Sequence, residues 1–193
     1  DKKSYLERLN QYTDRLSILI TDLFEVSKAN SGNIDLEYSD INIIEFMEQV
    51  CAENEELLQA KNLQLVTNLP EKEIHVCLDG NKTYRIFENL FTNISKYALE
   101  NTRVYMDVAV KEHDQVEITL KNISKNQLNL SEDELFERFK RGDNSRSTSG
   151  NGLGLSIAQS LMRLQNGSLH LVTDGDLFKA VVALNKTEPS AAL

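Results

Sequence analysis

Two amide side chains, a lysine and a tyrosine are spaced so that one helix would carry them along one side. In the stretch ENLFTNISKY, residues 88–97, Asn89 and Asn93 lie four positions apart, and Lys96 and Tyr97 follow three and four positions later. Residues at these spacings share a helix face. Amide oxygens can ligate a hard cation, a lysine can neutralise phosphate, and a tyrosine can donate a hydrogen bond. The stripe suits a magnesium nucleotide, although a solvated helix face can show the same pattern.

A glycine-rich stretch, GNGLGLS at residues 150–156, is the second candidate binding element. Gly152 and Gly154 stand where a helix is predicted to begin. The free N–H groups and partial positive charge of a helix N-terminus bind anions, and glycine lets a phosphate chain approach them. No Gly-Lys-Ser/Thr follows, which excludes a P-loop, and the strand order is not that of a dinucleotide-binding fold. A tight turn before a helix is the alternative.

The elements that must position these residues form a long helix followed by an α+β domain. Apolar residues in 3–30 are spaced alternately by four and three, as in a coiled coil or helical bundle. Periodicity predicts further helices over 42–60, 82–99 and 153–165, a helical patch over 131–139, and strands over 63–69, 73–79, 103–110, 115–122, 168–173 and 178–184. Helices on one face of a mainly antiparallel sheet fit this order. We expect domains over 1–34 and 35–193.

Composition narrows the class of protein. Of the 193 residues, 40% are apolar and 26% charged, and no apolar run approaches the length of a membrane span. This predicts a soluble, cytoplasmic globular chain without a signal peptide. The net charge of −9 argues against a general nucleic-acid binder. Cys51 and Cys77 lie in apolar runs without metal-like spacing, so both are predicted to be reduced core residues.

Three stretches together resemble a known family. ENLFTNISKY, then LFERFKRGDNSR at 135–146, then GNGLGLSIAQSL at 150–161 resemble the N, F and G2 boxes of sensor histidine protein kinases of bacterial two-component systems. Residues 3–30 resemble the second helix of the dimerisation and histidine-phosphotransfer domain. Residues 40–185 resemble the catalytic, ATP-binding domain. The fold implied is the Bergerat fold, a two-layer α/β sandwich with a mixed, mainly antiparallel sheet under three helices.

The resemblance implies roles for the polar helix stripe. Asn93 would be the main magnesium ligand, with Asn89 helping, and Lys96 and Tyr97 would contact the phosphates of ATP. Related ATPases carry a catalytic Glu at the position of Asn89, where it activates water. An Asn lacks that basicity, which favours phosphoryl transfer over hydrolysis.

The resemblance also implies a phosphate turn and a mobile ATP lid. The residues of the turn would be Asn151, Gly152, Leu153, Gly154 and Leu155. The backbone N–H groups of Gly152, Leu153 and Gly154 would cradle the phosphates, and Asn151 could reach the cation. Phe136 and Phe139 would anchor the lid, with 141–151 as its flexible part; simple core packing is the alternative for both. Arg141 could stabilise the transferring phosphoryl group, or be an exposed arginine without a role.

One family box is missing. The G1 motif, Asp-x-Gly-x-Gly, would fall in KNISKNQLN at 121–129, where Asn122 takes the place of the Asp and both glycines are absent. The Asp accepts a hydrogen bond from the adenine amino group. An Asn can accept through its carbonyl oxygen, without charge and with a choice of flips. We therefore expect adenine recognition to persist, through an uncharged and weaker acceptor.

The phosphoacceptor histidine is absent too. The family places it on the first bundle helix, followed by Glu or Asp and a proline kink. His75 and His170 lie in predicted strands, and His113 lies in a predicted hairpin without a following proline. We expect the acceptor upstream of residue 1, so that this chain is the second bundle helix and catalytic domain of a longer protein.

The function implied is transfer of the γ-phosphoryl group of ATP to that upstream histidine, for relay to an Asp of a response regulator. The full-length protein would dimerise through the helix bundle and be anchored in a membrane, and no nucleic acid is expected as a partner. One alternative is a degenerate kinase of the same fold that serves as a scaffold, which the missing G1 box favours. Another is a related ATPase or chaperone, against which Asn89 counts.

Overall fold

The computed structural model describes residues 35–128, 131–141 and 153–186, together with positions 13, 17, 20, 21, 24, 27 and 28. Those seven positions are helical and exposed. The rest of the predicted helix over 3–30 lies outside the described residues, so its bundle seam stays a prediction. Among the described helices, none combines the length and apolar character that crossing a bilayer requires.

The chain alternates helices with short strands. Its elements are β1 (Tyr38–Asn42), α2 (Ile43–Gln59), β2 (Gln64–Asn68), β3 (His75–Asp79), α3 (Gly80–Tyr97), β4 (Arg103–Val110), the 3-10 turn η1 (Glu112–Asp114), β5 (Gln115–Ile123), α4 (Glu132–Arg141), α5 (Gly154–Leu164), β6 (Ser168–Asp174) and β7 (Leu177–Asn185). They match the predicted elements within a few residues.

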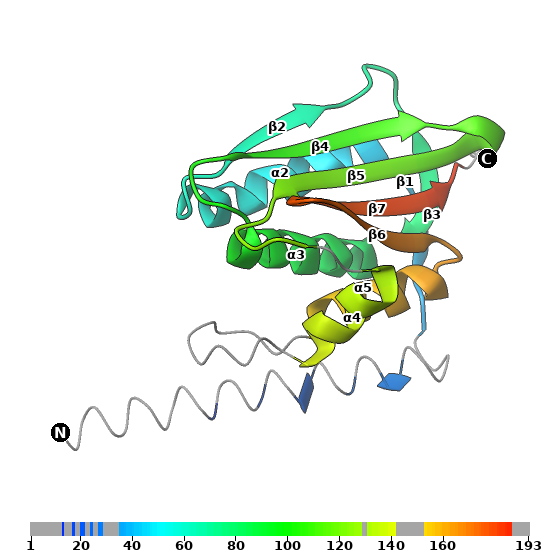
Figure 1. The fold of residues 1–193 in the computed structure, drawn as a ribbon. Coiled ribbons are helices and arrows are strands. Elements are labelled where there is room, and N and C mark those ends of the chain that lie inside the picture. The colour runs from blue at the N-terminus through cyan, green and yellow to red at the C-terminus, as the bar shows by residue number, and fades with distance from the viewer. Residues whose placement is uncertain are drawn as a thin grey trace, which may run out of the picture.

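Five strands make the main sheet, in the order β2-β4-β5-β7-β6. β2 and β4 run parallel, and the other pairs are antiparallel. β1 and β3 form a separate antiparallel pair. Figure 1 shows α2, α3 and α5 layered against the sheet. The predicted α+β sandwich, with a mixed and mainly antiparallel sheet, is confirmed.

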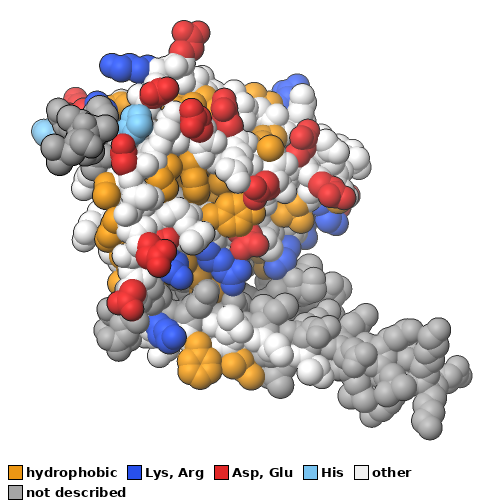
Figure 2. Space-filling view, turned by 180° about the vertical axis from the view of Figure 1, so that it is seen from behind, with side chains coloured by type: hydrophobic (Ala, Val, Ile, Leu, Met, Phe, Trp, Pro, Cys, Tyr) orange, Lys and Arg blue, Asp and Glu red, His pale blue; other side chains and the backbone are white. Residues whose placement is uncertain are grey.

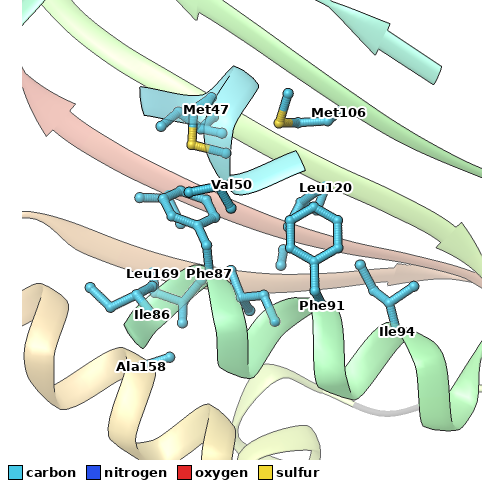
Figure 3. Close-up of a cluster of buried hydrophobic side chains, with 14 of the residues drawn as sticks. Met47, Val50, Ile86, Phe87, Phe91, Ile94, Met106, Leu120, Ala158 and Leu169 are labelled. Carbon is cyan, nitrogen blue, oxygen red and sulfur yellow. The ribbon is translucent and has the colours of Figure 1, made fainter. Parts of the chain in front are cut away.

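The core lies between the helices and the sheet. Burial alternates along β4 and β5, as expected when one face of a sheet is covered and the other faces water. Phe87 and Phe91 of α3 are fully buried and point toward Met106 of β4 and Leu120 of β5, with Met47 of α2 above them (Figure 3). This packing fixes the rotation of α3 about its axis, and with it the direction of the polar stripe.

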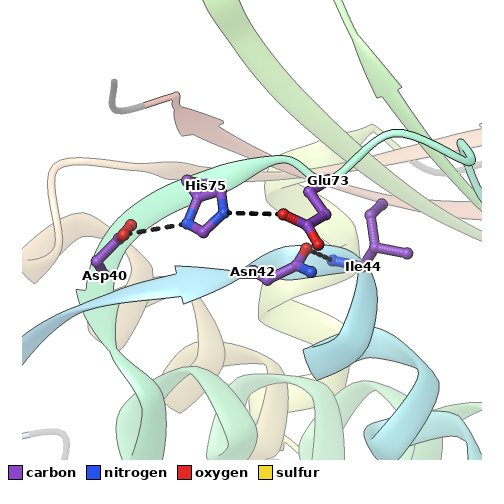
Figure 4. A network of polar contacts seen from close by, with 5 residues as sticks. All are labelled: Asp40, Asn42, Ile44, Glu73 and His75. Carbon is purple, nitrogen blue, oxygen red and sulfur yellow. Dashed lines mark hydrogen bonds and ion pairs between the residues drawn. The ribbon is translucent and has the colours of Figure 1, made fainter. Parts of the chain in front are cut away.

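The paired strands β1 and β3 carry a small polar cluster beside the start of α2. The Asn42 side chain caps α2 by accepting a hydrogen bond from the Ile44 N–H at 3.2 Å. His75 Nδ1 lies 3.0 Å from Asp40 Oδ2, and its Nε2 lies 3.7 Å from Glu73 Oε2 (Figure 4). His75 is therefore a strand residue placed between two carboxylates, consistent with the structural role predicted for it.

The prediction for Cys77 was wrong. Cys51 is buried in α2, but Cys77 is exposed. β3 pairs as a strand with β1 and makes one further bridge, between Val76 and Lys186. Its burial alternates, so that Val76 and Leu78 face the core while Cys77 faces out. The apolar run that contains Cys77 therefore forms a strand with only one buried face, because β3 is not a central strand of the main sheet.

Candidate functional site

Helix α3 carries the polar stripe beside its buried face. Asp79 caps the helix by accepting from the Lys82 N–H at 2.9 Å. The buried residues of the helix are Thr83, Ile86, Phe87, Leu90, Phe91 and Ile94. The predicted site residues Asn89, Asn93, Lys96 and Tyr97 are all half-buried. The stripe thus borders the core without being part of it, as residues that meet a ligand in a cleft must.

The glycine turn lies directly against this stripe. An ideal Cβ built on Gly154 would be 2.9 Å from Asn89 Oδ1, so only glycine leaves room for the amide as it stands. The Asn89 Nδ2 group donates to the Arg85 carbonyl at 2.9 Å, which turns the amide oxygen toward the turn. The expected juxtaposition of the two segments is therefore present at Asn89 and Gly154. An amide oxygen and a helix N-terminus meet there, a combination that suits a cation bound to phosphate.

The described part of the glycine stretch begins at Leu153. Leu153 occupies the N-cap position of α5, and its carbonyl accepts from the Ile157 N–H at 2.9 Å. Leu155 is buried, so it anchors the turn and can offer a ligand only its backbone. Asn151 and Gly152 lie outside the described residues, and their predicted contacts stay predictions.

Helix α4 holds the start of the predicted lid. A capping box opens it: Ser131 N–H donates to Glu134 Oε2 at 2.8 Å, and Glu134 N–H donates to Ser131 Oγ at 3.4 Å. The backbone and side-chain hydrogen bonds from Ser131 lower the pKa of Glu134. Phe136 packs against the core, which fits the anchoring role and equally the core-packing alternative. Arg141 ends the helix, and its side chain, like that of Phe139, lies outside the described residues.

Asn122 lies at the carboxyl end of β5 with one half of its amide unsatisfied. It is 3% exposed. Its Nδ2 donates to the Ile123 carbonyl at 3.2 Å, whereas its Oδ1 is buried and has no hydrogen-bond partner among the residues that the structure describes. Such groups are rare in native proteins and call for an explanation. The bond to Ile123 favours one of the two flips, leaving a carbonyl oxygen that would accept from an amino group such as that of adenine.

A buried polar cluster at the opposite end of α3 was not predicted. Gln165 Oε1 accepts from the Asp79 N–H at 2.7 Å and from the Thr83 hydroxyl at 3.3 Å. The second carboxylate oxygen of Asp79 accepts from the Glu37 N–H at 3.0 Å. We call Glu37, Asp79, Thr83 and Gln165 the α3–α5 clamp, because it joins the end of α5 to the start of α3. The sequence signal available was the preference for Asp at N-caps.

A further unpredicted pair ties α2 to α3. Hydrogen bonds from Gln49 and then Tyr84 lower the pKa of Glu53, and the bond to Glu53 raises the pKa of Tyr84. α2 also exposes Glu45, Glu48, Glu53, Glu55 and Glu56 and contains no Lys or Arg. Figure 2, seen from behind, shows carboxylates spread around apolar side chains, with Lys and Arg side chains gathered below them. A polyphosphate is therefore repelled by α2 and must find its cations elsewhere.

Comparison with known protein families identifies the family to which this chain belongs. Residues 78–188, more than half of the 193, match the family of histidine kinase-, DNA gyrase B-, and HSP90-like ATPases. The chain belongs to this family. The matched range includes α3, Asn122 and the glycine turn, so the site described above lies within the part of the chain that defines these ATPases.

Curated relatives in the family are sensor kinases. The sensor protein VanSC of Enterococcus gallinarum is 32% identical over 170 residues, which are 87% of this chain and 46% of that protein. The sensor histidine kinase WalK of Bacillus subtilis is 27% identical over 160 residues, 81% of this chain and 26% of that protein. The chain spans about half of the first relative and about a quarter of the second. The predicted resemblance to sensor histidine kinases is confirmed.

Solved structures show the same fold at low identity. Full-length ShkA in complex with AMPPNP has a TM-score of 0.81 at 18% identity, covering 98% of this chain and 40% of that one. Histidine kinase AdeS of Acinetobacter baumannii has a TM-score of 0.77 at 18% identity, covering 97% and 86%. Histidine kinase ThkA in complex with the response regulator TrrA has a TM-score of 0.72 at 18% identity, covering 96% and 51%. They establish the predicted Bergerat fold for this family member.

Proposed function

We propose that this chain binds ATP with Mg²⁺ and presents the γ-phosphoryl group to a histidine of the same sensor kinase. The observation that carries the proposal is a pair of features beside α3: Gly154 against the Asn89 amide oxygen, and the buried oxygen of Asn122, which has no hydrogen-bond partner among the described residues. The first suits phosphate with a cation, and the second suits an exocyclic amino group. ATP carries both.

The residues present fit a magnesium ion that arrives with the nucleotide. Mg²⁺ prefers oxygen ligands and is commonly held by a few protein oxygens together with substrate phosphates. Asn89 and Asn93 offer neutral amide oxygens, and no cluster of three acidic, His or Cys side chains suited to a metal occurs among the described residues. Bound there, the ion would neutralise charge on the phosphates. Lys96 and Tyr97 would add a cation and a hydrogen-bond donor.

The side chain of Asn89 favours transfer to a histidine over hydrolysis. A general base must hold a proton abstracted from water, and an amide has no such basicity. In the transfer, an imidazole nitrogen forms a bond to the γ-phosphorus as the bond to the bridging oxygen breaks, ADP leaves, and the imidazole loses its proton. Arg141 is proposed to lie near the transferred group. Phosphorylation of an Asp in a response regulator would follow.

The proposal extends to the whole protein. Residues 1–34 would be the second helix of the dimerising bundle, and 35–193 the catalytic domain. The acceptor histidine would lie upstream, in a homodimer whose full-length form is anchored in a membrane. The catalytic domain would work on the cytoplasmic side, where ATP is supplied. The partner would be a response regulator, as in the ThkA–TrrA complex.

Titration with a fluorescent ATP analogue and Mg²⁺ tests the binding step. We expect saturable binding that is lost in Asn93→Ala and kept in Asn68→Ala, since Asn68 lies on β2 and donates to Asp107. Absence of binding by the unaltered chain would favour a scaffold. Equal binding by Asn93→Ala would reject the assigned site. A version extended upstream through the acceptor histidine, given labelled ATP, then tests transfer.

A further inference from the structure

Lys125 holds the carboxyl end of α3 from the segment that follows β5. Its backbone N–H donates to the Tyr97 carbonyl at 2.9 Å, and its Nζ donates to the Lys96 carbonyl at 2.6 Å. The same Nζ lies 5.7 Å from the centroid of the Tyr97 ring. One side chain outside α3 thus contacts both residues to which the proposed site assigns the phosphates.

The backbone around Lys125 is fixed to the same helix end. Leu99 N–H, just after α3, donates to the Ile123 carbonyl at 2.8 Å. Ile123 directly follows Asn122, whose buried oxygen is proposed to read the base. The segment from Asn122 to Lys125 therefore ties the residue proposed to read the base to the end of α3 that carries Lys96 and Tyr97.

A cation at this position acts on the helix and on an anion. The last carbonyls of a helix lack intrahelical partners and carry partial negative charge, which a lysine stabilises. An ammonium over a tyrosine ring also restrains that ring. The chain has a net charge of −9, so its overall charge repels a polyanion such as a nucleotide. Each positive charge close to the phosphates therefore contributes more to the affinity.

We propose that Lys125 is a positioning residue of the nucleotide site: it fixes the end of α3 so that Lys96 and Tyr97 face the phosphates, and it adds one positive charge beside them. The inference rests on the proposed function, because it presupposes the nucleotide. The inference goes beyond the proposed function because it assigns part of the nucleotide affinity to a residue outside both the polar stripe and the glycine turn.

The test is magnesium-nucleotide affinity of the full chain at several salt concentrations. Lys125→Met should raise the Kd of a fluorescent ATP analogue about three- to tenfold and make the affinity less dependent on salt, since one cation is gone. Lys125→Arg, which keeps charge, donor and stacking, should stay within about twofold. Lys125→Gln keeps a donor without the charge, and it should also weaken binding; it replaces the Met variant should that one unfold at the assay temperature.

Lys121→Met is the matched control. Lys121 Nζ lies 5.9 Å from the Tyr105 ring centroid and 2.6 Å from Asp107 Oδ2, both on β4 and away from α3. It should leave the Kd within about twofold, because the same kind of cation–ring pair is lost from β4 and not from the end of α3. Unchanged affinity in Lys125→Met, or equal losses of affinity in both lysine variants, overturns the inference about Lys125. The proposed function still stands in that case if the unaltered chain binds the nucleotide and Asn93→Ala does not. Absence of parent binding rejects both.

Discussion

In the side-chain amide of Asn122, the nitrogen makes a hydrogen bond, whereas the oxygen accepts none from any described group. Its nitrogen is bonded to the Ile123 carbonyl, and that carbonyl also accepts from the Leu99 N–H. Its oxygen is buried without a partner. A buried acceptor left unpaired costs about 1–3 kcal/mol. The residue therefore lowers the stability of the free protein in a way that a bound amino group would reverse.

Asn122→Leu should separate stability from binding. The apolar side chain removes the unpaired acceptor, and Ile123 keeps its bond from Leu99, so the melting temperature without nucleotide should stay equal or rise. Affinity for the ATP analogue should fall about tenfold or more, because a base amino group would lose its acceptor. Calorimetry of the free and nucleotide-bound protein measures both. A variant that loses stability and binding together would point to a packing role instead.

The two thiols should differ sharply in reactivity. Burial, and then the negative charge of Glu48, raises the pKa of Cys51 to about 11, and the thiolate is the reactive form. Cys77 is exposed. At pH 8 a disulfide reagent should modify one thiol quickly and the second only after denaturant is added, and Cys77→Ser should abolish the fast phase. Two fast thiols in the native protein would contradict the burial of Cys51.

The raised pKa of Cys51 also sets a direction for stability at high pH. The folded state keeps this proton up to about pH 11, whereas an unfolded thiol loses it from about pH 9.0 upward. The unfolded state therefore gains as pH rises between these values, and the contribution of Cys51 to stability is lost across that window. Cys51→Ala should remove this part of the alkaline loss, as measured by denaturant unfolding at pH 8 and pH 10.

Among the elements, those with regular periodicity were predictable from sequence. Apolar spacing gives α3, and alternation gives β4 and β5, because each of these buries one face against the same core. Asn122 could be found because it stands after the strand VEITL, where the family that the sequence resembles carries the Asp of its G1 motif. Cys77 was misplaced because apolar content does not tell a strand of the main sheet from one in a two-stranded pair.

Contacts between distant elements were beyond that reasoning. Gln165 meets Asp79 across 86 positions, and the Lys125 ammonium meets the Lys96 carbonyl across 29. Neither pairing leaves a repeating pattern in the sequence, because each depends on how whole helices and strands pack. Candidate site residues could be named from the sequence, whereas the contacts that hold their elements in place could not.

The glycine that opens α5 should be irreplaceable for binding. In Gly154→Ala the new Cβ would meet Asn89 Oδ1 at 2.9 Å and displace the amide, so the ATP analogue should bind about tenfold or more weakly. Gly80→Ala is the matched control, since Gly80 opens α3 and its Cβ would meet the movable Ile41 side chain at 3.2 Å. Its Kd should change less than twofold. Equal effects in both variants would mean a general helix-start effect.

Over the whole molecule, the α3–α5 clamp adds hydrogen bonds between two helices that also pack together in one core. Gln165→Leu would leave the Asp79 N–H and the Thr83 hydroxyl buried without their acceptor, so the free energy of unfolding should fall by about 1–3 kcal/mol. Gln59→Leu is the control, because Gln59 lies at the exposed end of α2 and should change stability by less than about 0.5 kcal/mol. Urea denaturation measures both.

The Asp79 carboxylate couples the chain at Glu37 mechanically to the start of α3. One oxygen holds the first turn of α3, and the other holds the peptide of Glu37, just after the chain enters the domain. A pull or twist on the chain before Glu37 must either break that partly buried hydrogen bond or move the start of α3 with it. A force applied at Glu37 would therefore be transmitted to α3, the helix that carries Asn89 and Asn93.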